Sequence, residues 1–242
     1  MKKYGLKSLI AAAFVSGALA VLAQTLPPLP EMLQHMVQQM QQAKARNEEQ
    51  LHTYQWIETT TLTIDGTSRP AMQSTCRYAA DGTVLKTPLR PSEQQKMPGP
   101  MGGGPLMRHI VEKKKAEIQD QVEEIRGVMQ LYLPFNQAKL KEVLLTGNIG
   151  LEHDGANGNA LVLNDYAKPG DQLKLTLKPV TMQIDRISVK TYFESPADPM
   201  TADVSMATLP DGTKYPALTS INAPTKRLSI TTAESDFSKA AY

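Results

Sequence analysis

The clearest hydrophobic pattern in the chain is a strict alternation at residues 173–178, which read Leu-Lys-Leu-Thr-Leu-Lys. This period of two is typical of a strand with one apolar face and one solvated face. The threonine-rich segment 54–64 has the same parity, with Trp56, Leu62 and Ile64 on one side. We therefore predict that Trp56, Leu62 and the three leucines of 173–178 point inward, while Lys174 and Lys178 point to solvent.

Turn signals divide most of the chain into short strands. Asp65-Gly66 and Asp81-Gly82 are typical hairpin turns, so segments 54–64, 72–79 and 83–87 predict a three-stranded meander. Later strands are separated by Gly, Pro and Asp clusters. We expect them at residues 148–152, 160–166, 171–178, 182–193, 201–209, 214–221 and 227–231.

Two segments change to a helical period. Apolar residues at spacings of three and four predict long amphipathic helices over 31–52 and 106–133, and a shorter helix over 135–145. Between the meander and the second long helix, residues 88–105 contain five prolines and four glycines, which prevent helix or strand. This loop is either a mobile gate, with Met97, Met101 and Met107 as its apolar contacts, or a plain linker.

These elements predict an α+β protein in which two long helices cover the concave face of a curved antiparallel sheet, a half-open β-barrel. Curvature or closure hides the edges of such a sheet. With 242 residues, 41% hydrophobic and 21% charged, the chain can form a core without disulfides or metals. We expect one domain over residues 24–242.

Residues 1–23 have the order of a secretory signal peptide: lysines at 2, 3 and 7, an apolar run over 8–23, and small-residue sites. We expect cleavage before Gln24 and export to the periplasm; an uncleaved membrane anchor is the alternative. Without the three leader lysines, 26 basic residues become 23 against 24 acidic residues, so the net charge becomes −1. No clustered basic face indicates nucleic-acid binding.

The residues contain no recognisable catalytic or metal-binding motif. The four histidines have no partner at metal-ligand spacing, and neither a serine-hydrolase elbow nor a phosphate-binding loop is present. We expect no enzyme activity, no metal and no cofactor. Cys76, the single cysteine, fits a buried thiol better than a reactive one. The 12 methionines could bind Cu(I), but they fit an adaptable apolar surface better.

The order of elements carries a family resemblance. A leader, one helix, Tyr54-Gln55-Trp56 opening a meander, a crossing helix and a β-rich C-terminal half together resemble the periplasmic lipoprotein carrier (LolA/LolB-like) superfamily. The segments 186–192 (Arg-Ile-Ser-Val-Lys-Thr-Tyr) and 209–216 (Leu-Pro-Asp-Gly-Thr-Lys-Tyr-Pro) resemble uncharacterised envelope proteins of that type. The resemblance implies a half-open barrel with helices as a lid over an acyl-binding cavity.

From these observations we expect a monomeric, non-catalytic periplasmic protein that binds or carries a lipid-like acyl group, with a lipid or lipidated protein as partner. The alternative is an envelope module that packs its sheet fully and docks a protein partner. The apolar cavity residues that we predict are Met36, Met40, Trp56, Leu62, Met107, Val111, Leu173, Leu175 and Leu177.

Overall fold

A computed structural model describes residues 38, 42, 43, 45–89, 105–133, 137–153, 159–178 and 183–240. All but Gln38 belong to one compact unit, Gln42–Tyr242. The predicted leader, most of the first helix and most of the Pro/Gly loop lie outside the described residues. Within the first helix, residues 45–51 are helical.

The predicted meander is present. It consists of β1 (Tyr54–Ile64), the short β2 (Thr67–Ser68), β3 (Met72–Tyr78) and β4 (Val84–Pro88). Asp65 and Gly66 have φ of 52° and 74°, and Gly82 has φ of 82°. These values lie in the left-handed region that Gly and Asp tolerate, so the two Asp-Gly pairs form turns where the sequence predicts them.

Seven further strands follow two helices. The helices are α3 (Pro105–Met129) and α4 (Gln137–Thr146). The strands are β5 (Ile149–His153), β6 (Asn159–Asn164), β7 (Gln172–Leu177), β8 (Ile184–Tyr192), β9 (Pro199–Thr208), β10 (Lys214–Ala223) and β11 (Leu228–Lys239).

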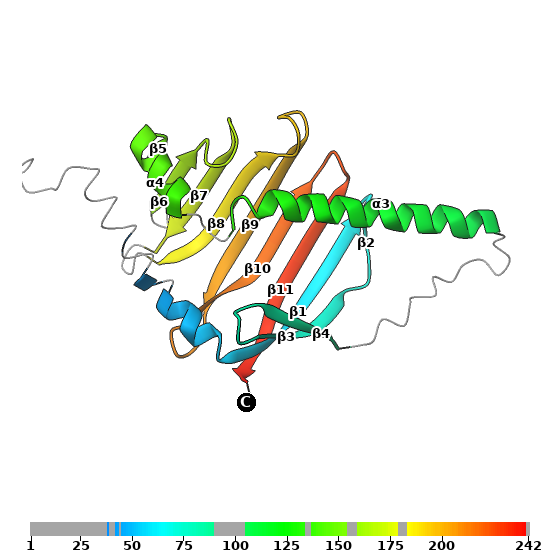
Figure 1. Ribbon diagram of the computed structural model, residues 1–242, viewed down its shortest axis with the longest axis horizontal. Helices are drawn as coiled ribbons and strands as arrows, with labels where there is room; N and C mark the ends of the chain where they lie inside the picture. The colour runs from blue at the N-terminus through cyan, green and yellow to red at the C-terminus, as the bar shows by residue number, and fades with distance from the viewer. Residues whose placement is uncertain are drawn as a thin grey trace, which may run out of the picture. The chain divides into compact units, whose positions relative to one another are not determined.

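In the described part of the chain, eleven strands form a single antiparallel sheet (Figure 1). Its order is β4-β3-β1-β11-β10-β9-β8-β7-β6-β5, with β2 attached to β1. From β5 to β11, each strand pairs with its neighbour in sequence. The exception is β1, which pairs with β11 from Tyr54↔Lys239 to Ile64↔Leu228 and so joins the meander to the C-terminal half. β4 and β5 are the edges, and no pairing between described residues closes the sheet.

The C-terminal half of α3 packs on the sheet. Ile125, Val128 and Tyr132 are spaced at three and four residues, and all three are buried. Glu124 forms an ion pair of 2.8 Å with Lys226, in the β10–β11 turn. Figure 1 accordingly shows α3 passing across β9, β10 and β11. No helix among the described residues is both long and apolar enough to cross a membrane.

The fold class is therefore α+β with a large open antiparallel sheet. The expectation that two long helices cover one face stays a prediction, because most of the first of them, residues 31–52, lies outside the described residues. The second is α3, with 25 residues, and α4, with 10, takes the place of the shorter helix expected over 135–145. One strand boundary was predicted wrongly. The last strand continues beyond Thr231 to Lys239, because its second half is held by pairing with β1 although its residues are mostly polar.

Candidate functional site: the apolar face of the sheet

One face of the sheet is apolar across almost its whole width. The pairing registers align residues of equal parity in two cross-strand rows, which we call the apolar face. The first row is Ile149, Leu163, Leu173, Val189, Ala202, Ile221, Ile230 and Leu62. The second row is Leu151, Leu161, Leu175, Ile187, Val204, Thr219, Thr232 and Thr60.

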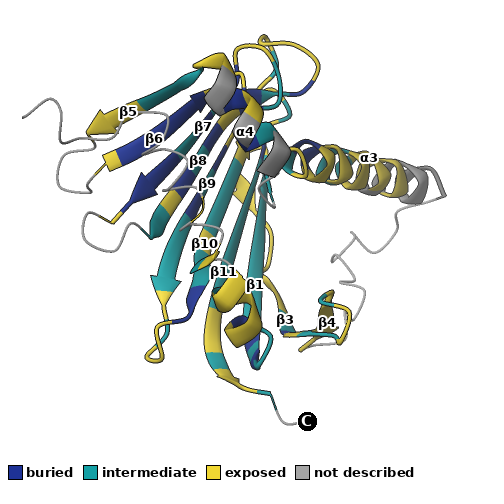
Figure 2. Ribbon diagram, turned by 60° about the vertical axis from the view of Figure 1, so that its left-hand side comes forward, coloured by how far each residue is buried: buried dark blue, intermediate teal, exposed yellow. Residues whose placement is uncertain are grey.

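Burial along the first row changes from strand to strand. From β6 to β9 its residues are core, with Leu173 fully buried and Val189 only 2% exposed. On β10, β11 and β1, the corresponding Ile221, Ile230 and Leu62 are only half-buried. Figure 2 shows the same change, from buried residues in β6 to intermediate ones in β10, β11 and β1. The apolar face is therefore packed at one end and accessible over its β10–β11–β1 part.

A buried polar cluster anchors the end of α3 at the packed end. The Tyr132 hydroxyl donates a hydrogen bond to the Asp171 carboxylate and lies 2.7 Å from Thr191 Oγ1. Asp171, 2% exposed, also accepts backbone N–H bonds from Tyr166, Ala167 and Lys168 at 2.7–3.0 Å. Burial, followed by the bond to Asp171, raises the pKa of Tyr132 above its ordinary value. These groups satisfy one another, so the cluster is structural.

Aromatic rings gather at the other end of β1. Trp56 stacks on Phe237 with centroids 5.7 Å apart and contacts Tyr78 at 5.3 Å. Phe237 in turn contacts Tyr215 at 4.3 Å. Trp56 is 4% exposed, and its Nε1 has no hydrogen-bond partner among the described residues. Since Trp56 has the parity of Leu62, the rings extend the apolar face toward the C-terminal end of β11.

Two glutamates interrupt the apolar face beside these rings. Glu58 on β1 lies directly opposite Glu234 on β11, and both have the parity of Leu62. Lys86 Nζ lies 2.7 Å from both carboxylate oxygens of Glu58. Burial, followed by the charge of Glu58, raises the pKa of Glu234 to about 8. The fully buried Cys76 is nearby, and burial raises the pKa of its thiol.

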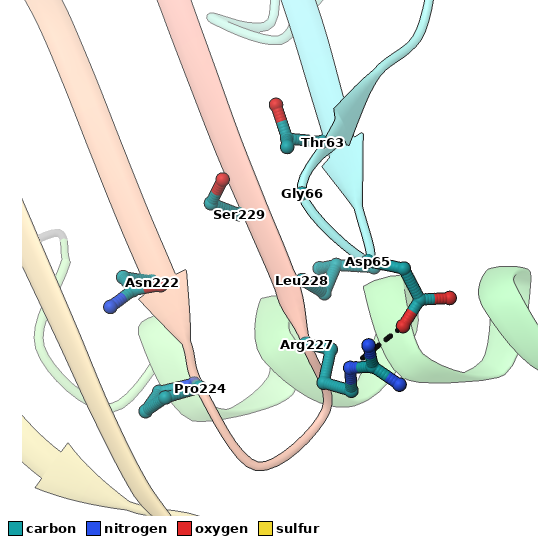
Figure 3. A pocket seen from close by; sticks show the side chains of 8 residues that line it. All are labelled: Thr63, Asp65, Gly66, Asn222, Pro224, Arg227, Leu228 and Ser229. Atoms are coloured by element: carbon teal, nitrogen blue, oxygen red, sulfur yellow. Dashed lines mark ion pairs between the residues drawn. The ribbon is translucent and has the colours of Figure 1, made fainter.

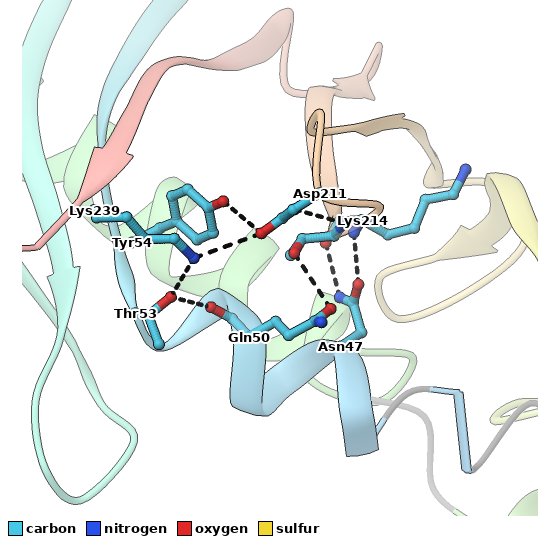
Figure 4. A network of polar contacts seen from close by, with 8 residues as sticks. Asn47, Gln50, Thr53, Tyr54, Asp211, Lys214 and Lys239 are labelled. Carbon is cyan, nitrogen blue, oxygen red and sulfur yellow. Dashed lines mark hydrogen bonds and ion pairs between the residues drawn. The ribbon is translucent and has the colours of Figure 1, made fainter.

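A polar network fixes the helical segment 45–51 to the β9–β10 turn (Figure 4). The Asn47 side-chain amide forms two hydrogen bonds with the backbone of Lys214. Its Nδ2 donates to Lys214 O at 2.8 Å, and its Oδ1 accepts from Lys214 N at 2.5 Å. Tyr54 donates to Asp211 at 2.6 Å, and Lys239 lies 3.5 Å from the same carboxylate. The Tyr54 hydrogen bond is the main cause that holds the pKa of Asp211 well below its usual range.

A hollow of about 430 Å³ lies near the Asp65-Gly66 turn (Figure 3). Thr63, Asn222 and Ser229 line it, and their parity places them on the face opposite the apolar one. Arg227 Nε pairs with Asp65 Oδ1 at 2.8 Å across the rim. Because charged and polar side chains lie beside Pro224 and Leu228 in its lining, this hollow suits an apolar ligand less well than the apolar face does.

The structure places the predicted cavity residues as follows. Leu173, Leu175 and Leu177 are on the apolar face and at most 1% exposed, so they are packed core at its covered end. Leu62 and Trp56 are on the same face. For Met107 and Val111 the structure describes only the backbone, within α3, and Met36 and Met40 lie outside the described residues. Their role in a cavity stays a prediction.

Sequence reasoning missed several residues of this region. Ile221 and Ile230 lie in strands that were predicted, but no local pattern shows that these strands carry the accessible part of the face. Glu58 shares the parity of Trp56, so the alternation in its strand could have placed it on the apolar face. Glu234 lies beyond the predicted end of its strand, so no such pattern was available for it. Asp171 was assigned to a turn and to the start of a strand, without any role in a buried cluster. Among the described residues, no three metal-ligating side chains converge.

Comparison with known proteins finds solved structures that are similar to this chain at 10% identity. No protein-family model and no curated protein matches the chain. A DUF1329 family protein from Desulfovibrio piger aligns with TM-score 0.40 and 10% identity, covering 84% of this chain and 93% of that one. A LolA superfamily protein from Nitrosomonas europaea aligns with TM-score 0.37 and 10% identity, covering 84% and 94%.

Proposed function

We propose that this protein is a non-catalytic carrier that binds an acyl chain on the accessible part of its apolar face. The half-buried state of Ile221, Ile230 and Leu62 supports this proposal most directly. These three residues are register neighbours on β10, β11 and β1. They continue a row whose members on β6 to β9 form the core, so an acyl chain lying along them would extend that core.

The energetics of such binding are favourable. Burial of apolar surface contributes about 0.8 kcal/mol per methylene, so covering about eight methylenes yields about 6 kcal/mol before the entropic cost of association. No covalent chemistry is required. The leader expected at residues 1–23 supports action in the periplasm, where a water-insoluble acyl group needs a protein to carry it.

The test is binding of a fluorescent fatty-acid probe to the mature protein, together with lipid extraction and native mass spectrometry of the purified protein. The variant Ile230→Asn places a polar group on the accessible part of the apolar face. The matched control, Thr231→Asn, changes the adjacent residue on the opposite face. Loss of one buried isoleucine contact corresponds to about 1.5 kcal/mol or more, which is about tenfold in affinity.

We expect the wild-type protein and Thr231→Asn to bind the probe equally, and Ile230→Asn to bind about tenfold more weakly. Absence of probe binding and of co-purified lipid in the wild type would refute the carrier function. That result would favour the alternative, a packed envelope module that docks a protein partner.

A further inference from the structure

Lys214 carries a buried ammonium group that has no hydrogen-bond partner in the part of the chain that the structure describes. The residue is 9% exposed, and its Nζ is fully buried. Only its backbone is satisfied, by Asn47. Figure 4 shows the side chain extending away from Asn47 and the rest of the polar network. A buried charge without a counterion is costly, so this position is unfavourable unless something else pairs with it.

The charged groups around Lys214 include more positive than negative charges. Lys178 and Asp185 are its charged neighbours, and the Lys178 and Asp185 side chains pair with each other at 3.3 Å. Burial, followed by the charge of Lys178, lowers the pKa of Lys214. The group therefore contains two ammonium groups and one carboxylate, which already has a partner.

Lys214 lies on the same face as the apolar rows. It pairs with Thr208 on β9, and Thr208 has the parity of Met206 and Val204. Val204 belongs to the second row of the apolar face, and the half-buried Met206 lies between it and Thr208. At about 3.4 Å per residue, Thr208 is about 14 Å along the strand from Val204. Lys214 is thus at the end of the apolar face. Lys178 follows the buried Leu177 with opposite parity, so it approaches Lys214 from the other face, at the end of β7.

We propose that Lys214 and Lys178 bind the anionic headgroup, a carboxylate or a phosphate, of an acyl ligand whose chain lies on the apolar face. This inference rests on the proposed carrier function and specifies the class of its ligand. An anion between the two ammonium groups would accept charge-assisted hydrogen bonds from both, which are about twice as strong as neutral ones. It would also relieve the repulsion between the two lysines.

The experiment compares two probes that share one acyl chain and one fluorophore: a fatty acid with a free carboxylate and its methyl ester. Both are titrated into the mature wild-type protein and into Lys214→Met, Lys178→Met and Lys190→Met. Lys190 is exposed on the opposite face, so Lys190→Met is the matched control. Inorganic phosphate is added as a competitor, because it separates a site for lipid headgroups from a site for free anions.

We expect the wild type and Lys190→Met to bind the acid at least tenfold more tightly than the ester. In Lys214→Met the preference falls below about threefold, while ester affinity is unchanged. Lys178→Met also lowers the preference for the acid over the ester. Because the Lys178 side chain is half-exposed, this variant replaces Lys214→Met in the test if Lys214→Met does not fold. Displacement of the acid but not the ester by millimolar phosphate assigns the site to free anions and overturns the headgroup assignment.

Equal affinity of the wild type for acid and ester, or a tenfold preference retained in Lys214→Met, overturns the headgroup site while leaving the carrier function standing. Failure of the wild type to bind either probe overturns both. The two failures are therefore distinguishable within one set of titrations.

Discussion

The glutamate pair on the apolar face makes a sharp prediction about stability and pH. Glu234 faces Glu58 across β1 and β11, while Lys86 binds both oxygens of Glu58. The lysine therefore neutralises Glu58, and Glu234 remains beside a carboxylate in a largely buried position. Cys76 and Tyr78 complete its titratable surroundings. We expect Glu234→Gln to remove a cost that the wild type carries at alkaline pH.

The sign follows from proton binding. The pKa of Glu234 is about 8 in the folded protein against an ordinary 4.5. Between these values, the folded state binds more protons than the unfolded state, so the free energy of unfolding falls as pH rises. At about 1.4 kcal/mol per pH unit, the gap of about 3.5 corresponds to a ceiling of about 5 kcal/mol. Partial access of water to the carboxyl reduces it to about 1–2 kcal/mol.

The assay is urea unfolding of both proteins at pH 5 and pH 9. We expect the wild type to lose about 1–2 kcal/mol more than Glu234→Gln between these pH values. Glu194→Gln, at an exposed position in the β8–β9 turn, is the control and should follow the wild type. If Glu234→Gln has the same pH profile as the wild type and the control, Glu234 is ionised in the folded protein at neutral pH, and the reasoning fails.

Two further predictions concern the packed end of the sheet. Tyr132→Phe removes the hydroxyl that binds the buried Asp171 and should lower the free energy of unfolding in urea by about 1–3 kcal/mol. Its control, Tyr192→Phe, loses one exposed hydrogen bond and should lower it by under about 1 kcal/mol. Equal losses in the two variants would show that the Tyr132 contact does not anchor α3. Leu175→Ala should cost about 2–5 kcal/mol and Lys174→Ala under about 1 kcal/mol, and similar losses in both variants would show that the assigned facing of β7 is wrong.

The parts of the fold that depend on local periodicity were predictable. A period of two is set by the geometry of each strand, so it assigned Leu175 and Trp56 to one face without any knowledge of their partners. The Asp-Gly pairs predicted the first two turns for the same reason. What local pattern lacks is information about pairing between distant segments. The joining of β1 to β11 therefore had no signal, and the last strand was ended too early.

The end of β11 shows why the alternation of apolar and polar residues did not predict the full length of this strand. Residues 232–239 read Thr-Ala-Glu-Ser-Asp-Phe-Ser-Lys, with Phe237 as the one large apolar residue. Asp236 has φ of 54°, and the pairing with β1 shifts register at Gln55/Ile57. A bulge of this kind inserts an extra residue and breaks the alternation. Phe237 therefore meets Trp56 from a position that a strict period of two would not assign.

Parity alone also cannot separate core from ligand surface, and this distinction decides the function. Leu173 and Leu62 belong to the same cross-strand row, yet Leu173 is fully buried and Leu62 is half-buried. The difference comes from what covers each strand, which depends on contacts between segments far apart in the sequence. Likewise, Lys214 follows a Pro-Asp-Gly turn and has the composition of a solvated strand end. Its burial beside Lys178 and Asp185 arises only when β10 is placed beside β9.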